Sequence, residues 1–320
     1  MALENAALSA SIKLSIQETA EVTGESRSQV CCIQPFIDNE IKKNIMDKCE
    51  FKPWLNRWKL IPDGTPLITH TSQLLPVTTE TGGIKAMLKI TGDADEQAGN
   101  ALMAWWEGNG AAHTIAHENE AILLARATGS ASLSTMSREG QDAEACRIMC
   151  LTANLLHTAR ERPLPQLTPL HEWFYPLKPA ARKYGDILTR SAEISEELLS
   201  TSHDVVALHG DLHHENVLDF GASGWLAIDP KGLKGERGFD FANIFTNPDL
   251  VNPLPRVATV PDIFKQRLKI VTEIAGLDRV RLLKWIIAWC GLSTTWSLES
   301  NETVTIALEV AKLAIAELDQ

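Results

Sequence analysis

The pattern of apolar and polar positions from Trp54 onward predicts a small antiparallel sheet. Short β-like runs separated by turn signals follow one another: WLNRWKLIP, PLITHT, QLLPVTT and IKAMLKI. A helix is predicted over residues 93–107, because apolar side chains recur there at i, i+4 and i+7 and glycines follow. Two further β-like runs, AAHTIAH and AILLARA, complete this part of the chain.

Beyond Ala127 the periodicity becomes mainly helical. An apolar stripe predicts a helix over residues 140–160, which a proline-rich connection ends. The runs VVALHGD, NVLDF and WLAIDP return to β character, and the last two predict a hairpin that turns at GASG. Three amphipathic helices, with stripes beginning at Phe264, Leu283 and Val304, finish the chain.

This order predicts an α+β fold with two unequal lobes. Residues 45–126 are expected to form an N-lobe with an antiparallel sheet and one helix, and residues 127–320 a larger, mainly helical C-lobe. Residues 1–44 are polar and irregular, with a possible short helix from Ile41 to Cys49. They form a predicted extension of unknown role.

Charge and composition limit the partners that such a chain can bind. The 320 residues carry a formal net charge of −11, which disfavours nucleic acid and anionic membranes and favours cationic small molecules. The six cysteines are too sparse for a disulfide framework and are expected to be reduced thiols. Neither a secretory signal nor an apolar run of membrane-spanning length is recognisable, so we expect a cytoplasmic protein.

The most informative segment is LHGDLHHEN, followed by AIDP. A tight loop after a strand can direct Asp211 at a hydroxyl group, whose proton it accepts. Asn216 lies at the far end of this loop, and the predicted hairpin returns Asp229 beside it. One amide and one carboxylate provide the hard oxygen ligands that Mg²⁺ prefers. This order of residues is typical of a phosphoryl-transfer site of the kinase type.

Such a site also needs a cation for the phosphates of ATP. Lys89 lies in a predicted strand, and Glu96 follows in the first turns of the next helix, where it can reach the lysine. The loop from Thr69 to Gln73 is expected to cover the phosphates, although Ser72 is its only small residue. By position, the backbone carbonyl of Ala125 and the amide of Ala127 are candidates for binding adenine.

Less specific interpretations compete with these assignments. His-Gly-Asp and Asp-Pro are common at turns, and a lone lysine in a strand is often an exposed edge charge. His213 and His214 lack metal-site spacing, so loop packing is favoured over a contact with substrate or phosphate. The combination of all these residues in one order nevertheless favours the kinase interpretation.

The chain resembles the aminoglycoside and hydroxyurea phosphotransferase family, and within it the streptomycin 6-kinase-like enzymes. The resemblance spans roughly Ile45 to Leu318, and its most specific segment is LHGDLHHENVLDFGASGWLAIDPKGLKGERGFDFANIF. It implies a two-lobed protein-kinase-like fold and the use of ATP and Mg²⁺. It implies phosphorylation of a hydroxyl group on streptomycin or a similar aminocyclitol.

By motif, Asp211 is similar to the catalytic aspartate of this family, and Asn216 and Asp229 to its metal ligands. Lys89 and Glu96 match its phosphate-binding lysine and helix glutamate, with Asp95 as a neighbouring alternative to the latter. Asp240 resembles an aspartate that supports the catalytic loop. Ala125 stands where the family usually has glutamate, which a backbone contact with adenine tolerates.

Substrate identity stays open at this level. The C-terminal helices, with an expected loop from Thr294 to Glu302, are predicted to form the substrate wall. Hydroxyurea or an endogenous hydroxylated metabolite is an alternative acceptor. A pseudokinase that binds nucleotide without catalysis is the alternative from another class, disfavoured because Lys89, Asp211, Asn216 and Asp229 are all present. Nothing in the sequence determines the oligomeric state.

Overall fold

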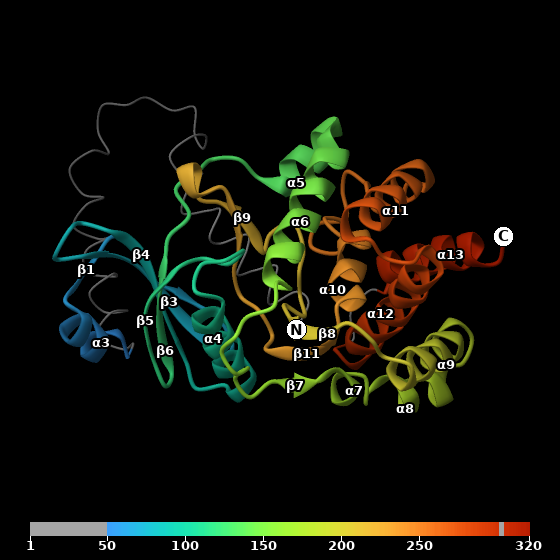
Figure 1. Cartoon of the computed structure of the whole chain (residues 1–320), viewed down its shortest axis with the longest axis horizontal. Coiled ribbons are helices and arrows are strands. Elements are labelled where there is room, and N and C mark those ends of the chain that lie inside the picture. The colour runs from blue at the N-terminus through green and yellow to red at the C-terminus, as the bar shows by residue number, and fades with distance from the viewer. Residues whose placement is uncertain (1–49, 301–303) are drawn as a thin grey trace, which may run out of the picture. The chain divides into compact units, whose positions relative to one another are not determined.

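A computed structural model describes residues 50–300 and 304–320, which divide into two compact units (Figure 1). The smaller unit contains residues 50–97 and Thr114–Arg126, and the larger unit contains Ala98–His113 and Ala127–Gln320. The proposed extension 1–44 and the possible helix from Ile41 to Cys49 lie outside the described residues. The lobe boundaries stay a prediction.

The smaller unit is built on a six-stranded antiparallel sheet. Its strands are β1 (Leu60–Pro62), β2 (Leu67–Ile68), β3 (Ser72–Thr79), β4 (Lys85–Thr91), β5 (Thr114–Glu118) and β6 (Ala121–Ala125). They run in the order β1-β3-β4-β6-β5, and β2 pairs with β3. Alternate side chains bury one face, where Leu75, Val77, Leu88 and Leu123 form a core. This predicted sheet is therefore present.

The segment predicted as the first strand is wrong in part, because it begins as the helix α3 (Phe51–Trp58). Phe51, Trp54, Leu55 and Trp58 lie at helical spacing, and all four pack on the core of the sheet. Only the end of the run, LIP, is extended, as β1. A short run rich in tryptophan is compatible with both helical and strand periodicity. Here the helix is favoured because it places all four apolar side chains on one face.

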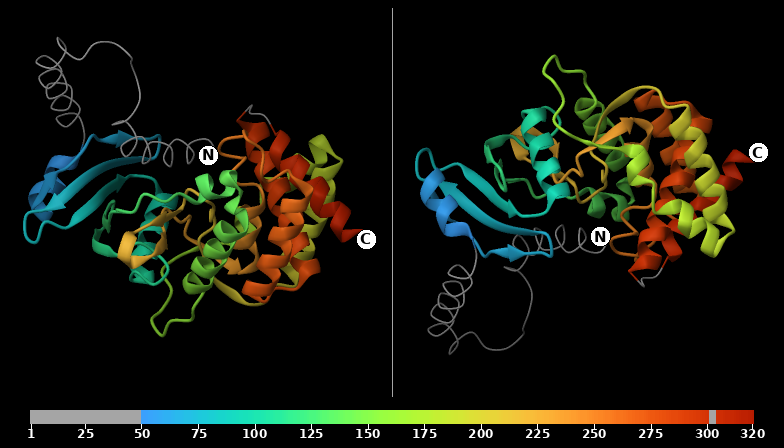
Figure 2. Two further views of the ribbon diagram at one scale, coloured as in Figure 1. Left: turned by 90° about the horizontal axis from the view of Figure 1, so that it is seen from above. Right: turned by 90° about the horizontal axis from the view of Figure 1, so that it is seen from below.

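Helices dominate the larger unit. They are α4 (Ala94–Trp106, which begins in the smaller unit), α5 (Leu133–Met136), α6 (Asp142–Leu156), α7 (Leu170–Trp173), α8 (Leu177–Tyr184), α9 (Ile187–Ser200), α10 (Gly238–Ala242), α11 (Pro261–Ala275), α12 (Arg279–Glu299) and α13 (Thr305–Leu318). Helix α12 packs against α9, α10 and α13, and α11 packs against α6. The C-terminal helices lie side by side in both views of Figure 2.

The predicted helices over residues 93–107 and 140–160 and the three at the end of the chain are all confirmed as α4, α6, α11, α12 and α13. Helices α7 to α9 were not predicted, because prolines and polar residues interrupt their apolar stripes. The expected loop from Thr294 is wrong as far as Glu299, since these residues form the last turns of α12. Within the described part of the chain, no helix is both long and apolar enough to cross a bilayer.

Two small sheets carry the loops of the larger unit. Strands β9 (Val217–Asp219) and β10 (Trp225–Ala227) form the predicted antiparallel hairpin, with a helical turn at Gly221–Ser223. A second sheet, which was not predicted, has the order β7-β11-β8, from Thr168–Pro169, Leu233–Glu236 and Val205–Leu208. Strand β11 pairs in parallel with β7 and antiparallel with β8, so it fixes where β8 ends and the following loop begins.

Candidate active site

The loop between β8 and β9 contains the predicted catalytic residue. Gly210 adopts φ +82°, and a Cβ added there would lie 2.8 Å from Leu233 Cδ1, so the turn requires glycine. The amide of Lys231 donates to the carbonyl of His209 at 2.7 Å. His209 Nε2 donates to the carbonyl of Ile228 at 2.8 Å. These bonds connect the start of the loop to the segment that follows the β9–β10 hairpin.

Asp240 on α10 binds the backbone at the start of this loop. Its Oδ2 accepts from the amide of His209 and its Oδ1 from the amide of Gly210, each at 2.8 Å. His157 Nε2 lies 2.8 Å from the same Oδ2, and the carboxylate is fully buried. The contact between Asp240 and this loop, which the family resemblance implies, is therefore present. A buried carboxylate with several donors orders a backbone turn strongly, because charged acceptors form strong hydrogen bonds.

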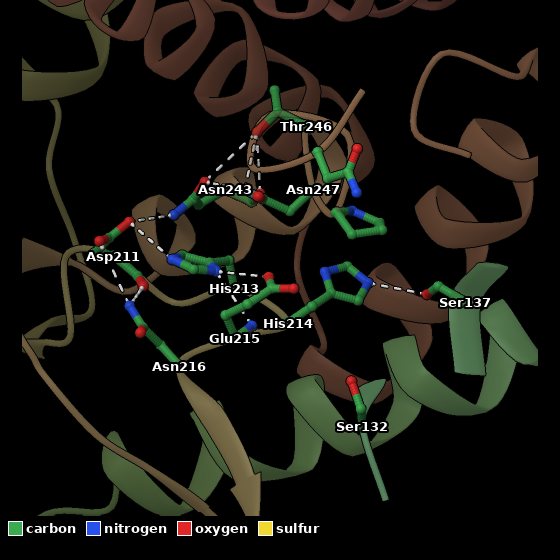
Figure 3. A network of polar contacts seen from close by, with 12 residues as sticks. Ser132, Ser137, Asp211, His213, His214, Glu215, Asn216, Asn243, Thr246 and Asn247 are labelled. Atoms are coloured by element: carbon green, nitrogen blue, oxygen red, sulfur yellow. Dashed lines mark hydrogen bonds and ion pairs between the residues drawn. The ribbon is translucent and has the colours of Figure 1, made fainter. Parts of the chain in front are cut away.

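Asp211 follows directly and has partners on both carboxylate oxygens (Figure 3). Asn243 Nδ2 donates to Oδ1 at 2.9 Å, and His213 Nε2 lies 3.8 Å from the same oxygen. Asn216 Nδ2 lies 3.5 Å from Oδ2 and donates to the backbone carbonyl of Asp211 at 2.9 Å. The side chain keeps 18% exposure. It is therefore held in one orientation and still reachable from solvent.

The two predicted metal ligands lie beside each other in the same unit. The amide of Ile228 donates to the carbonyl of Asn216 at 2.9 Å, so Asp229 follows a residue paired with Asn216. Asp229 adopts φ +59°, a conformation that costs on the order of 1–3 kcal/mol for a non-glycine residue. Strained backbone of this kind is common where a side chain must be aimed at a ligand.

The donor set fits a magnesium ion bound to phosphates. The Nδ2 of Asn216 is used by Asp211, and no hydrogen bond to its Oδ1 is found among the described residues. The amide oxygen of Asn216 is a neutral hard ligand and the side chain of Asp229 a charged one, a combination that suits Mg²⁺. In the described ranges, no three or more His, Cys, Asp or Glu side chains form a metal cluster. Phosphate oxygens and water are the further ligands that Mg²⁺ commonly takes in kinase sites.

The two loop histidines are buried, as the packing interpretation predicts, and their pKa values shift in opposite directions. Burial alone would lower the pKa of His213, but the neighbouring Asp211 and Glu215 outweigh it and the pKa is raised. Burial, together with the nearby Arg267, lowers the pKa of His214 to about 3. His214 Nε2 contacts Ser137 Oγ at 3.0 Å, so this neutral ring joins the loop to the segment before α6.

In the smaller unit, Lys89 of β4 forms an ion pair with Glu96 of α4. Both side chains are nearly buried, at 8% and 11% exposure. Asp93 Oδ1 accepts from the amides of Asp95 and Glu96, so it caps the helix. Asp95 is exposed, and the pairing therefore selects Glu96 rather than its neighbour.

The other residues predicted to contact nucleotide are Ser72, Ala125 and Ala127. Ser72 is the first residue of β3, and its amide donates to Thr69 Oγ1 at 3.0 Å, so that amide already has a partner. Its buried hydroxyl finds no partner within the described residues. Ala125 ends β6, opposite Ala86, and Ala127 begins the next segment of the larger unit. Their roles toward phosphate and adenine stay predictions.

Asn243 was missed from the sequence, although a signal was present. Asp240 and Asn243 are polar residues at i, i+3 in the otherwise apolar run GFDFANIF, which is unusual for a buried helix. Both are about 99% buried and both contact the catalytic loop. A polar pair on the buried face of a helix would have indicated a supporting role.

Comparisons with known proteins identify the family to which the chain is similar. A family model described as aminoglycoside/hydroxyurea antibiotic resistance kinase matches residues 57–301. A streptomycin 3''-kinase of Klebsiella pneumoniae is 50% identical over 242 residues, 76% of this chain and 90% of that one. A streptomycin 6-kinase of Streptomyces griseus is 30% identical over 276 residues, 82% of this chain and 86% of that one.

Among solved structures, an amicoumacin kinase in complex with AMP-PNP and Ca²⁺ aligns with a TM-score of 0.58. The alignment covers 87% of this chain and 96% of that chain at 13% identity. A likeness at this level of identity concerns the fold. The predicted protein-kinase-like α+β fold is confirmed.

Proposed function

The chain belongs to the aminoglycoside/hydroxyurea antibiotic resistance kinase family, and from this premise we propose that it transfers the γ-phosphoryl group of ATP to a hydroxyl group of streptomycin. The observation that carries the proposal is the ordered loop in which Asp211 is held beside Asn216, with Asp229 next to Asn216. The 50% identity to a streptomycin 3''-kinase supports the choice of acceptor.

In the proposed reaction, the acceptor oxygen forms a bond to the γ-phosphorus while the bond to the leaving ADP oxygen breaks. Asp211 orients the hydroxyl group and takes its proton, which leaves it late because the transition state is loose. Catalysis then depends mainly on positioning, and the donors from Asn216 and Asn243 keep the carboxylate of Asp211 in place. This role explains why a partly exposed side chain has such ordered surroundings.

The charged groups around ATP have separate proposed roles. Mg²⁺, held by Asn216 and Asp229, would neutralise charge on the phosphate oxygens. Lys89 binds oxygens of phosphates that are not transferred, and Glu96 keeps its ammonium group in position within the smaller unit. Ser72 contributes its hydroxyl to a phosphate, while the backbones of Ala125 and Ala127 bind adenine. A reaction that uses ATP is expected to take place in the cytoplasm.

The position of phosphorylation separates two versions of this proposal. The resemblance seen in the sequence suggests a 6-kinase, and the 6-kinase of S. griseus is 30% identical. The K. pneumoniae relative, a 3''-kinase, is 50% identical, and we therefore propose the 3''-hydroxyl first. The net charge of −11 suits a substrate that carries guanidinium and ammonium groups.

The test is ADP release with streptomycin, other aminoglycosides and hydroxyurea side by side, with the product assigned by NMR. We expect turnover with streptomycin and a phosphate on the 3''-oxygen. Asp211→Ala should lower kcat by about 10²–10⁴-fold, the usual contribution of a general base, while the affinity for ATP stays unchanged. Near-normal turnover of this variant would remove Asp211 from the mechanism.

Other outcomes identify the alternatives. Turnover with hydroxyurea alone would favour the second substrate in the family description. ATP binding without turnover on any acceptor would favour an endogenous metabolite or a pseudokinase. A phosphate on the 6-oxygen would keep the substrate and overturn the proposed position.

A further inference from the structure

We propose that Asn243 is a positioning residue that holds the Asp211 carboxylate by its Oδ1 atom, and that Asn247 and Arg267 fix the orientation of Asn243. The inference rests on the proposed function, in which Asp211 accepts the proton of the substrate hydroxyl. All three residues lie outside the loop that carries Asp211: Asn243 contacts that loop directly, and Asn247 and Arg267, the latter on α11, reach it through Asn243.

The first step is the contact with the carboxylate. Asn243 Nδ2 donates to Asp211 Oδ1 at 2.9 Å, and Asn243 is only 1% exposed. His213 Nε2 lies 3.8 Å from the same oxygen (Figure 3). A carboxylate fixed through one oxygen can rotate little about its terminal bond. Asn243, with the longer contact of Asn216 Nδ2 to Oδ2 at 3.5 Å, therefore limits where the other oxygen of Asp211 points.

The second step concerns which end of the Asn243 amide faces Asp211. Asn247 Nδ2 donates to Asn243 Oδ1 at 2.9 Å, and Thr246 Oγ1 lies 3.5 Å from the same atom. A flipped Asn243 would place its carbonyl oxygen against the Asp211 carboxylate and its NH₂ group against the NH₂ group of Asn247. Both contacts would be repulsive, so Asn247 selects the orientation that donates to Asp211.

The side-chain amide of Asn247 donates hydrogen bonds to Asn243, while its own oxygen stays unsatisfied within the described residues. Its Nδ2 faces Asn243 Oδ1, the Asn243 backbone carbonyl and Thr246 Oγ1, at 2.9, 3.2 and 3.4 Å. Its own Oδ1 is buried and finds no donor in the described part of the chain. An unsatisfied buried acceptor costs about 1–3 kcal/mol, so packing alone does not account for this side chain.

The third step anchors Asn247 to α11. Arg267 Nη1 donates to the carbonyls of Ile244 and Asn247, at 2.7 and 2.6 Å. Arg267 is fully buried, and its guanidinium group is itself held by Asp142, with Nε to Oδ2 at 3.0 Å. A continuous chain of hydrogen bonds thus runs from Arg267 through Asn247 and Asn243 to Asp211.

The test uses Asn243→Ala, Asn247→Ala and the double variant in the full-length protein. A displacement of the base by about 1 Å can cost 10²-fold in rate, so we expect Asn243→Ala to lower kcat by about 10–100-fold. The KM for the acceptor and the Kd for AMP-PNP should change by less than about threefold. Because Asn247 acts through Asn243, the double variant should match Asn243→Ala in kcat, and the two effects should not add.

Asn154→Ala is the matched control. Asn154 lies in the same unit and its Nδ2 donates to the carbonyl of Ile274 at 3.1 Å, away from Asp211. Loss of this partly buried hydrogen bond should lower the unfolding midpoint, with kcat unchanged. Should Asn243→Ala fail to fold, Asn243→Ser keeps a polar group in the pocket but is too short to reach Asp211, and the same loss in kcat is expected.

Three results would overturn the inference: a kcat within twofold of the unmutated protein, additive effects of the two alanine variants, or a fall in kcat matched by the control. The failure of the proposed function is distinguishable, because the unmutated protein itself would then turn over none of the acceptors. In that case crystal structures of the unmutated protein and Asn243→Ser decide. A rotated Asp211 carboxylate supports the positioning role, and an unchanged one refutes it.

Discussion

Replacing Arg267 by methionine tests the buried ion pair that anchors the larger unit. Arg267 donates to Asp142 Oδ2 at 3.0 Å and Oδ1 at 2.5 Å, and to two backbone carbonyls. Methionine keeps most of the unbranched stem but leaves the Asp142 carboxylate buried without its cation. Removal of one partner of a buried pair costs about 3–5 kcal/mol, and we expect this loss in the free energy of unfolding at pH 7.

The loss should depend on pH, with a sign that follows from Asp142. Burial by itself would raise the pKa of Asp142, but the hydrogen bonds and charge of Arg267 outweigh it and hold the pKa below 3.8. In the native protein, the stabilisation that the Asp142–Arg267 ion pair gives the folded state is therefore present above pH 3.8 and is lost as the pH falls through the folded-state pKa of Asp142. In Arg267→Met, burial dominates and the pKa of Asp142 rises above 3.8. Acidification then protonates the carboxyl group and reduces the penalty.

The assay is urea unfolding followed by tryptophan fluorescence and circular dichroism at pH 7 and pH 4.5. The destabilisation by Arg267→Met should be smaller at pH 4.5 than at pH 7. The slope of the unfolding free energy with urea concentration, the m-value, should not change. The double variant Asp142→Leu/Arg267→Met removes both charges and should recover much of the loss. A destabilisation below about 1 kcal/mol, or one that is equal at the two pH values, would refute the reasoning.

Three further predictions address the loop, the phosphate lysine and the metal. Asp240→Asn turns one acceptor of the His209 and Gly210 amides into a donor, so the free energy of unfolding in urea should fall by about 2–4 kcal/mol and kcat should fall as well. A variant as active and as stable as the native protein would contradict this role. Lys89→Met removes a charged donor worth about 1.5–3 kcal/mol and should weaken ATP binding about 10–100-fold by titration calorimetry, and unchanged affinity would exclude the lysine from the phosphate site. Chelation with EDTA should abolish turnover and added Mg²⁺ should restore it, and turnover that persists in EDTA would argue against a metal. Asn216→Ala should raise the Mg²⁺ concentration that gives the half-maximal rate about tenfold or more.

The proximities that the sequence predicts and the structure confirms are those between residues close together along the chain. Asp211 and Asn216 share one loop, and a short hairpin brings Ile228, the residue before Asp229, back to Asn216. Lys89 and Glu96 are seven residues apart, across one strand-to-helix connection. Short connections have few possible geometries, so the order of residue types was sufficient to predict which of them meet.

Errors arose where local pattern and tertiary packing compete. Helix α3 was predicted as a strand, because a short apolar run is compatible with both periods until a surface is available for it to cover. The pairing of β11 with β7 and β8 joins segments that are far apart in sequence and carry little alternation of their own. Such pairings are selected by the surrounding helices rather than by propensity.

The amino-acid sequence alone thus determined the family, the α+β class and the types of residue in the candidate site. Only the tertiary structure decided how Asp211 is held. Asn243 lies 32 residues from Asp211, and Asp142 lies 125 residues from Arg267, yet each pair forms a direct hydrogen bond. Periodicity and spacing describe forces between near neighbours, whereas contacts over such separations exist only after packing has excluded water, which favours hydrogen bonds among the polar groups that it buries.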